Sequence, residues 1–335
     1  MIMGNNKQSY IDAGRYNTIL SVAFEESKRY KNKLNIEQDI VVVDEDGNEY
    51  NRFSMDKFME KASFLKTIGG NRNFNIPDSK CFMGKIGCTK LKAPSRDKAD
   101  IHIVIHDLRT NMTPTLGFSI KSQLGSPSTL LNATEATNIR YLVIGKKMND
   151  KELQEINSIE DHLPRMQALV ERGYKLQYSD IEHQTFKNNL LFLDTCMPEF
   201  IAACLICDSM PNSTSKIKDA VELVAKQNPF GFTGSDVIAF YEHKMKVLLL
   251  DAALGMTPAK EWKGRYDANG GYLVVRKDGE IVCYHFYNRN DVEDYLYKNT
   301  RFERGSRSRH HFGTLYRGVD GKVYIKLNLQ IRFNN

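Results

Sequence analysis

The chain has 335 residues, of which 41% are hydrophobic and 26% are charged, an ordinary balance for a globular protein with a sizeable core. Its formal net charge of +6 is compatible with a polyanionic partner, although many enzymes without such a partner are equally basic. The sequence contains no apolar run of membrane-spanning length, and MIMGNNKQSY lacks the apolar core of a signal peptide. We therefore expect a cytoplasmic protein without a membrane-bound segment.

The N-terminal third mixes helical and strand patterns around a long irregular segment. We expect a helix over residues 9–30, a strand over 40–43 and a second helix over 54–65. The glycine-rich stretch at 69–95 carries several lysines, and it is either a solvent-exposed loop or a contact to DNA.

Residues 99–138 form the stretch on which the functional interpretation depends. Polar and apolar residues alternate over 100–107 and again over 116–124, which predicts two strands joined by a turn that contains Asn111 and Pro114. Ser126-Pro127-Ser128 then has the capping hydroxyl and the first-turn proline of a helix start, which places Glu135 about two turns into a helix.

The predicted hairpin places Asp100, Ser119 and Lys121 on one polar face. A carboxylate can bind a hard divalent ion such as Mg2+, which stabilises charge on a phosphate. A neighbouring lysine can orient or deprotonate the attacking water and neutralise the developing charge. This combination suits phosphodiester cleavage, although a hairpin with one acid and one lysine can also be a simple solvated surface.

The order of these residues resembles the PD-(D/E)XK nuclease core: an acid, a hairpin, and then Ser119-Ile120-Lys121 with serine in place of the second acid. A subgroup of restriction enzymes that cut CCGG-containing sites has this serine and takes its acid from the next helix, with thirteen residues between the lysine and that acid. Here 13 residues, 122–134, separate Lys121 from Glu135. The segment GFSIKSQLGSPSTLLNATEATN is also similar to HpaII-type restriction endonucleases.

The resemblance implies a restriction-endonuclease-like fold and Mg2+-dependent hydrolysis of duplex DNA at CCGG. It implies that Asp100 and Glu135 bind the metal, that Lys121 positions or activates the water, and that Ser119 or Gln123 supports the metal shell. Ala99 replaces the usual proline, which contributes no chemistry. The replacement of the second acid by Ser119 leaves Glu135 as the favoured acid and Gln123 as a neutral alternative.

The middle of the chain reads as helical scaffold. A third core strand is expected over 140–144, followed by helical patterns near 150–172, 181–193, 198–209, 214–226 and 234–254. Cys204 and Cys207 form a C-x-x-C in an apolar helical stretch without a second pair at zinc spacing, so we interpret the cysteines as structural thiols.

The C-terminal part is rich in strands. Asp278-Gly279 and Asp320-Gly321 each lie between strand patterns, 271–276 with 281–287 and 314–317 with 322–333, which predicts two hairpins with a short helix between them. The intervening TRFERGSRSRHHFG holds the densest positive charge in the chain, which favours contact with DNA over a solvated loop. The candidate DNA-binding residues are Arg301, Arg304, Arg307, Arg309, His310 and His311.

We therefore expect an α/β fold with a mixed β-sheet core flanked by helices, a helical middle region and a β-rich C-terminal part. The expected regions are a catalytic core at 1–145, a helical region at 146–262 and a DNA-contacting region at 263–335. The partners are duplex DNA and a second copy of the chain, since a twofold-symmetric site suits a symmetric dimer. Two alternatives are a structure-selective or repair nuclease on the same core and a basic nucleic-acid-binding protein without enzymatic activity.

Overall fold

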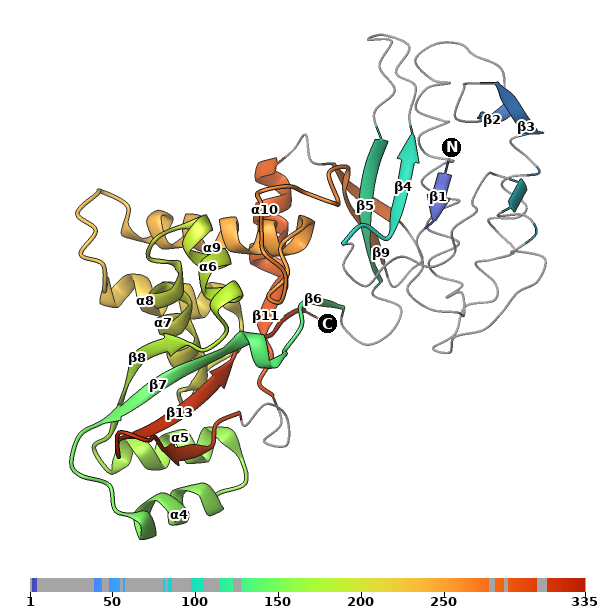
Figure 1. The fold of residues 1–335 in the computed structure, drawn as a ribbon. Helices are drawn as coiled ribbons and strands as arrows, with labels where there is room; N and C mark the ends of the chain where they lie inside the picture. The colour runs from blue at the N-terminus through green and yellow to red at the C-terminus, as the bar shows by residue number, and fades with distance from the viewer. Residues whose placement is uncertain are drawn as a thin grey trace. The chain divides into compact units, whose positions relative to one another are not determined.

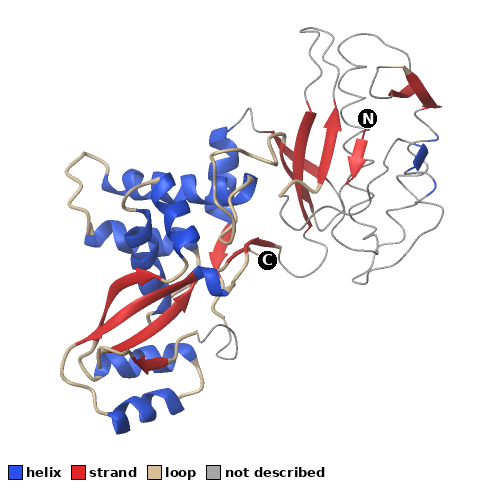
Figure 2. Cartoon of the chain, in the orientation of Figure 1, coloured by secondary structure: helices blue, strands red, loops and turns tan. Residues whose placement is uncertain are grey.

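The computed structural model describes residues 2–4, 39–43, 48–54, 57, 81, 84–85, 98–104, 115–122, 128–276, 281–285, 289–305 and 312–334. The chain folds as a mixed α/β protein whose contacts define two compact units, one formed by residues 1–128 with 265–289 and the other by residues 129–264 with 290–334 (Figures 1 and 2). This grouping differs from the three consecutive regions expected from the sequence, because the hairpin near residue 275 pairs with the N-terminal strands.

The first unit is built on a mixed five-stranded sheet in the order β1-β4-β5-β9-β10, in which β5 and β9 run parallel and the other pairs are antiparallel. A separate antiparallel pair, β2-β3, belongs to the same unit. The strands are β1 (Ile2–Gly4), β2 (Asp39–Val43), β3 (Glu49–Ser54), β4 (Ile101–Val104), β5 (Thr115–Ser122), β9 (Gly271–Val275) and β10 (Ile281–His285).

The second unit contains a four-stranded antiparallel sheet, β12-β13-β7-β8, and a three-stranded sheet, β11-β14-β6. Its strands are β6 (Thr129–Leu131), β7 (Asn138–Ile144), β8 (Lys175–Ile181), β11 (Thr300–Phe302), β12 (Leu315–Arg317), β13 (Val323–Asn328) and β14 (Ile331–Phe333). The described helices are α4 (Asp150–Ser158), α5 (His162–Glu171), α6 (Gln184–Leu193), α7 (Met197–Ser209), α8 (Ile217–Gln227), α9 (Val237–Leu254) and α10 (Arg289–Asn299).

Helices α6 to α9 pack against one another and form the core of the second unit (Figure 1). Both α7 and α9 are apolar on nearly every side, which is typical of helices that are buried all round. On α7, Phe200, Ile201 and Cys204 are fully buried, as expected for a structural thiol. Among the described helices no single one is long and apolar enough to cross a membrane. Helices α6 and α7 reach that length and composition only when taken together, and the chain bends by 103° between them.

Much of the predicted secondary structure is confirmed. The hairpin β4-β5, both C-terminal hairpins, the helix between them and the strand at 140–144 are present, as are the helices of the middle region. The expected helix at 9–30 and nearly all of that at 54–65, with the loop at 69–95, lie outside the described residues. The third core strand, expected over 140–144 within the catalytic core at 1–145, is β7, which pairs with β8 and β13 in the second unit.

The prediction of a helix after Ser126-Pro127-Ser128 is wrong. Thr129–Leu131 form strand β6 instead, and Glu135 begins a 3-10 turn, Glu135–Thr137, rather than lying two turns into an α-helix. Leu130 and Leu131 are buried, and β6 pairs with β14 from the far end of the chain. This long-range pairing outweighs the local signals for a helix start.

Candidate active site

The candidate site begins directly before β4, where Asp100 faces β5. Ile101 pairs with Phe118 in the antiparallel ladder, and the backbone N–H of Asp100 donates to the Phe118 carbonyl at 2.7 Å. Because side chains alternate along a strand, Asp100 and Ser119 lie opposite each other on the same face. The hairpin therefore brings together the first two residues of the predicted polar face.

One carboxylate oxygen of Asp100 is held by β5. The backbone N–H of Ile120 donates to its Oδ2 at 2.7 Å, and the Ser119 hydroxyl lies 3.3 Å from the same oxygen as a donor. Ser119 is only 2% exposed, so this bond is shielded from water. The two donors fix the orientation of the carboxylate, and among the described residues none donates to its Oδ1.

Lys121 lies two residues beyond Ser119 on the same face of β5 and is half-buried. Its Nζ lies 5.6 Å from the centre of the Tyr272 ring, a cation–π geometry. Tyr272 stands on β9 directly beside Ser119 in the parallel register and is 1% exposed. The sequence analysis missed this tyrosine, because no local pattern indicates that β9 will pair with β5.

Two glycines hold the hairpin against the segment that leads into β9. Gly117 donates to Asn269 Oδ1 at 2.6 Å, and its carbonyl accepts from the N–H of Gly270 at 2.7 Å. A Cβ on Gly117 would overlap the Asp267 carbonyl oxygen, and a Cβ on Gly270 would lie 2.6 Å from Phe118 Cζ. Only glycine permits this close approach, which aligns β9 beside β5 and so places Tyr272 near Lys121.

The remaining predicted metal-shell residues are placed differently. Glu135 is exposed at the start of its 3-10 turn and belongs to the second unit, whereas Asp100, Ser119 and Lys121 belong to the first. Gln123 lies outside the described residues. Among the described residues no group of three histidine, cysteine, aspartate or glutamate side chains could enclose a metal ion. The hairpin thus provides one oriented carboxylate, a hydroxyl and a lysine.

Two of the predicted DNA-binding residues are described, and both lie in the second unit. Arg301 on β11 forms an ion pair with Glu303 at 3.2 Å. Arg304 is bound through Nε and Nη2 to the Asp208 carboxylate, at 3.1 Å each, and through Nη2 to the Asp208 carbonyl at 2.8 Å. Asp208 is 2% exposed, so Arg304 contributes to folding. The others, Arg307, Arg309, His310 and His311, lie outside the described residues.

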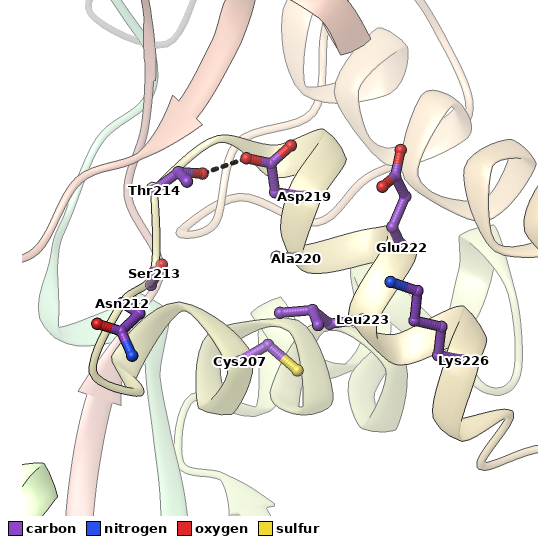
Figure 3. A pocket seen from close by; sticks show the side chains of 9 residues that line it. All are labelled: Cys207, Asn212, Ser213, Thr214, Asp219, Ala220, Glu222, Leu223 and Lys226. Carbon is purple, nitrogen blue, oxygen red and sulfur yellow. Dashed lines mark hydrogen bonds between the residues drawn. The ribbon is translucent and has the colours of Figure 1, made fainter.

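A hollow of about 220 Å³ lies between the end of α7 and the start of α8 (Figure 3). Its carboxylates already have partners, since Asp219 accepts from the Thr214 hydroxyl and Glu222 lies 3.7 Å from Lys218 on the same helix. These contacts stabilise the first turns of α8. We therefore assign the hollow no catalytic role.

The mixed sheet thus carries an oriented acid, a serine and a lysine on one face, a combination that can hold a divalent ion beside a phosphate. The model of the HpaII restriction endonuclease family matches residues 2–333. The type II restriction enzyme HpaII of Haemophilus parainfluenzae is 45% identical over 322 residues, which cover 94% of this chain and 88% of that enzyme. No solved structure matches the chain significantly.

The chain therefore belongs to the HpaII restriction endonuclease family. It is a type II restriction endonuclease, a hydrolase that cuts duplex DNA. Enzymes of this kind generally need a divalent metal ion.

Proposed function

We propose that this enzyme hydrolyses duplex DNA at CCGG with Mg2+ as its metal ion. The observation that supports this most strongly is the carboxylate of Asp100, held by Ile120 N–H and the Ser119 hydroxyl on the face that carries Lys121. The site CCGG is supported by membership of the HpaII restriction endonuclease family and by the spacing from Lys121 to Glu135.

The donor set of the hairpin fits Mg2+. This ion prefers oxygen ligands, keeps several waters and is usually bound by one or two carboxylates together with substrate phosphates. Asp100 provides one carboxylate whose Oδ1 accepts no hydrogen bond from the described residues, while its Oδ2 is fixed. We propose that Glu135 provides the second carboxylate and that Ser119 or Gln123 supports the shell. When bound, the metal ion would stabilise negative charge on the phosphate and lower the pKa of a bound water.

Residues of this chain would accept the proton of the attacking water and offset the charge that develops on the phosphate. Asp100 would hold the ion beside the scissile phosphate, with its own carboxylate oriented by Ile120 N–H and the Ser119 hydroxyl. Lys121 orients the attacking water or takes its proton, and its ammonium form offsets charge that develops on the phosphate. Its contact with Tyr272 restricts where the ammonium group can lie. Activity should therefore depend on both Asp100 and Lys121.

We propose that the arginine-rich segment binds DNA, because dense positive charge binds phosphates and arginine can read guanine. The residues in this proposal are Arg301, Arg307, Arg309, His310 and His311. Arg304 belongs to the same proposal, but its ion pair with Asp208 makes its role in stability the stronger expectation. A symmetric dimer would match the twofold symmetry of CCGG.

The decisive experiment is cleavage of plasmid DNA with many CCGG sites in the presence of Mg2+. We expect discrete fragments from the native protein, none from Lys121→Ala, and native fragments from Lys151→Ala, which removes an exposed lysine from α4. Mapping the fragment ends tests CCGG directly. Cutting without sequence preference would instead indicate a structure-selective nuclease, and intact DNA with both Mg2+ and Mn2+ would contradict the proposal.

A further inference from the structure

The candidate site lies at the edge of the first unit's sheet where the parallel strands β5 and β9 end. Strands β4, β5 and β9 are neighbours in this sheet (Figure 1). Lys121, near the end of β5, pairs with Val274 on β9, and Arg276 follows two residues later, directly after β9 ends. Because β4 runs antiparallel to β5, Asp100 at its start lies at the same edge. The sheet thus brings one acid and two cations, Asp100, Lys121 and Arg276, to a single edge.

Arg276 follows β9 on the face that carries Lys121. Val274 pairs with Lys121, whose ammonium group lies over the Tyr272 ring, so these β9 residues share that face, and Arg276 is next in the alternation. Tyr284 pairs with Tyr272 across the β9-β10 hairpin and belongs to the same face. Burial raises the pKa of Tyr284, and the positive charge of Arg276 opposes this rise. The guanidinium group therefore acts on a side chain of the candidate face.

Exposure to solvent increases along this face toward the edge. Tyr272 is 1% exposed and Val274 is 3% exposed, whereas Lys121 is half-buried and Arg276 is exposed. With strands about 4.8 Å apart and a rise of about 3.3 Å per residue, the Cα atoms of Lys121 and Arg276 are about 8 Å apart. Two long side chains at this separation can reach one bound group. Ligands of open α/β sheets bind outside the carboxyl ends of the strands, which is where these two cations lie.

The following inference rests on the proposed function. We propose that Arg276 is a further catalytic residue, which binds the non-bridging oxygens of the scissile phosphate. Arginine can donate two parallel hydrogen bonds to a phosphate and stays protonated throughout. As the water oxygen bonds to phosphorus and the P–O ester bond breaks, negative charge grows on these oxygens, and a fixed guanidinium group stabilises it. Arg276 thereby shares charge stabilisation with Lys121, which also acts on the attacking water.

Single-turnover cleavage of a CCGG duplex at saturating enzyme with Mg2+ measures the catalytic effect. We expect Arg276→Gln to lower the cleavage rate constant about 100-fold or more, the usual loss when a donor to developing charge is removed. Arg276→Lys should lower it about tenfold, because lysine keeps the charge but not the two parallel donors. The control Arg265→Gln makes the same charge change at an exposed position that precedes β9, and it should cleave at the native rate.

Metal-free binding separates contact with the scissile phosphate from a structural role. Two CCGG duplexes are compared, one with the natural phosphate at the linkage found by mapping the fragment ends and one with a neutral methylphosphonate there. For Arg276→Gln we expect the slope of log K against log salt to fall in magnitude by about 0.9 with the phosphate duplex. The methylphosphonate duplex should bind this variant and the native protein equally well.

Two results would overturn the inference while leaving the proposed function intact. The first is a native cleavage rate constant in either Arg276 variant, and the second is an equal loss of affinity of Arg276→Gln for both duplexes. Failure of the native protein to cut CCGG DNA would instead overturn the proposed function together with this inference.

Discussion

Lys121 and Tyr272 meet across β5 and β9, with the ammonium nitrogen 5.6 Å from the centre of the aromatic ring. Tyr272 also stands beside Ser119, whose hydroxyl donates to Asp100, so one face of the sheet links the acid, the serine, the lysine and the ring. Because Tyr272 is buried, its ring is fixed in place and restricts where the ammonium group can lie. The position of the proposed water-activating group therefore depends on a strand from the C-terminal part of the chain.

The aromatic ring, rather than the hydroxyl, should be what positions Lys121. We expect Tyr272→Phe to keep a cleavage rate constant close to the native one, and Tyr272→Leu to lower it about tenfold or more, since the cation–π contact is lost. Single-turnover cleavage measured at saturating enzyme separates this effect from DNA binding. If both variants lose activity equally while remaining folded, the ring contact does not position the lysine.

Asp100 should repel DNA when no metal is bound. Asp100→Asn removes a negative charge that faces the phosphate, so we expect metal-free affinity for the CCGG duplex to rise about five- to thirtyfold, corresponding to roughly 1–2 kcal/mol. Cleavage with Mg2+ should be lost. Asp236→Asn is the matched control, because asparagine can still accept the capping bond from Ala239 N–H. A fall in metal-free affinity of Asp100→Asn would show that Asp100 does not face the phosphate.

We expect Arg304 to contribute to the stability of the fold more than to DNA binding. Its partner Asp208 is buried and also accepts from the Ser213 hydroxyl at 3.0 Å, so removal of the arginine leaves an uncompensated buried charge. We expect Arg304→Gln to lower the free energy of unfolding by about 3–5 kcal/mol in urea titrations. Arg317→Gln, which breaks a more exposed pair with Asp150, should cost about 0–1 kcal/mol. Unchanged stability with weakened DNA binding would identify Arg304 as a DNA contact.

His162 should make the protein less stable in mild acid. Burial, followed by the positive charges of Arg304 and Arg165, lowers the pKa of His162 to about 4. Because the unfolded state has the ordinary pKa near 6.5, it binds more protons between these values, and stability therefore falls as the pH drops from about 7 to about 4.

The variant His162→Leu tests this directly, because it removes the titrating group from the site. We expect it to flatten the pH dependence of the urea midpoint between pH 7 and pH 4.5, whereas His243→Gln, at an exposed position on α9, should retain the native dependence. An equal slope in native protein and His162→Leu would assign the acid sensitivity to other groups.

Local patterns in the sequence were enough to predict the strands of the candidate site. Alternating residues predicted β4 and β5, and the spacing of Asp100, Ser119 and Lys121 placed them on one face, because strand periodicity and turn residues act over a few positions. The two Asp-Gly signals likewise predicted the hairpins β9-β10 and β12-β13. Membership of the family could also be predicted from the sequence, since it depends on the order of residues alone.

The long-range pairing of strands and the burial of polar groups could be read from the folded structure alone. The parallel pairing of β5 with β9 brings Tyr272 to Lys121, and the pairing of β6 with β14 replaces the helix that Ser126-Pro127-Ser128 predicted. The same long-range packing buries Asp208 against Arg304 and aligns Arg301 with Arg332. Each of these outcomes depends on contacts between residues far apart in the chain. The free energy of these contacts exceeds the local conformational preferences, and no periodic pattern in the sequence predicts them.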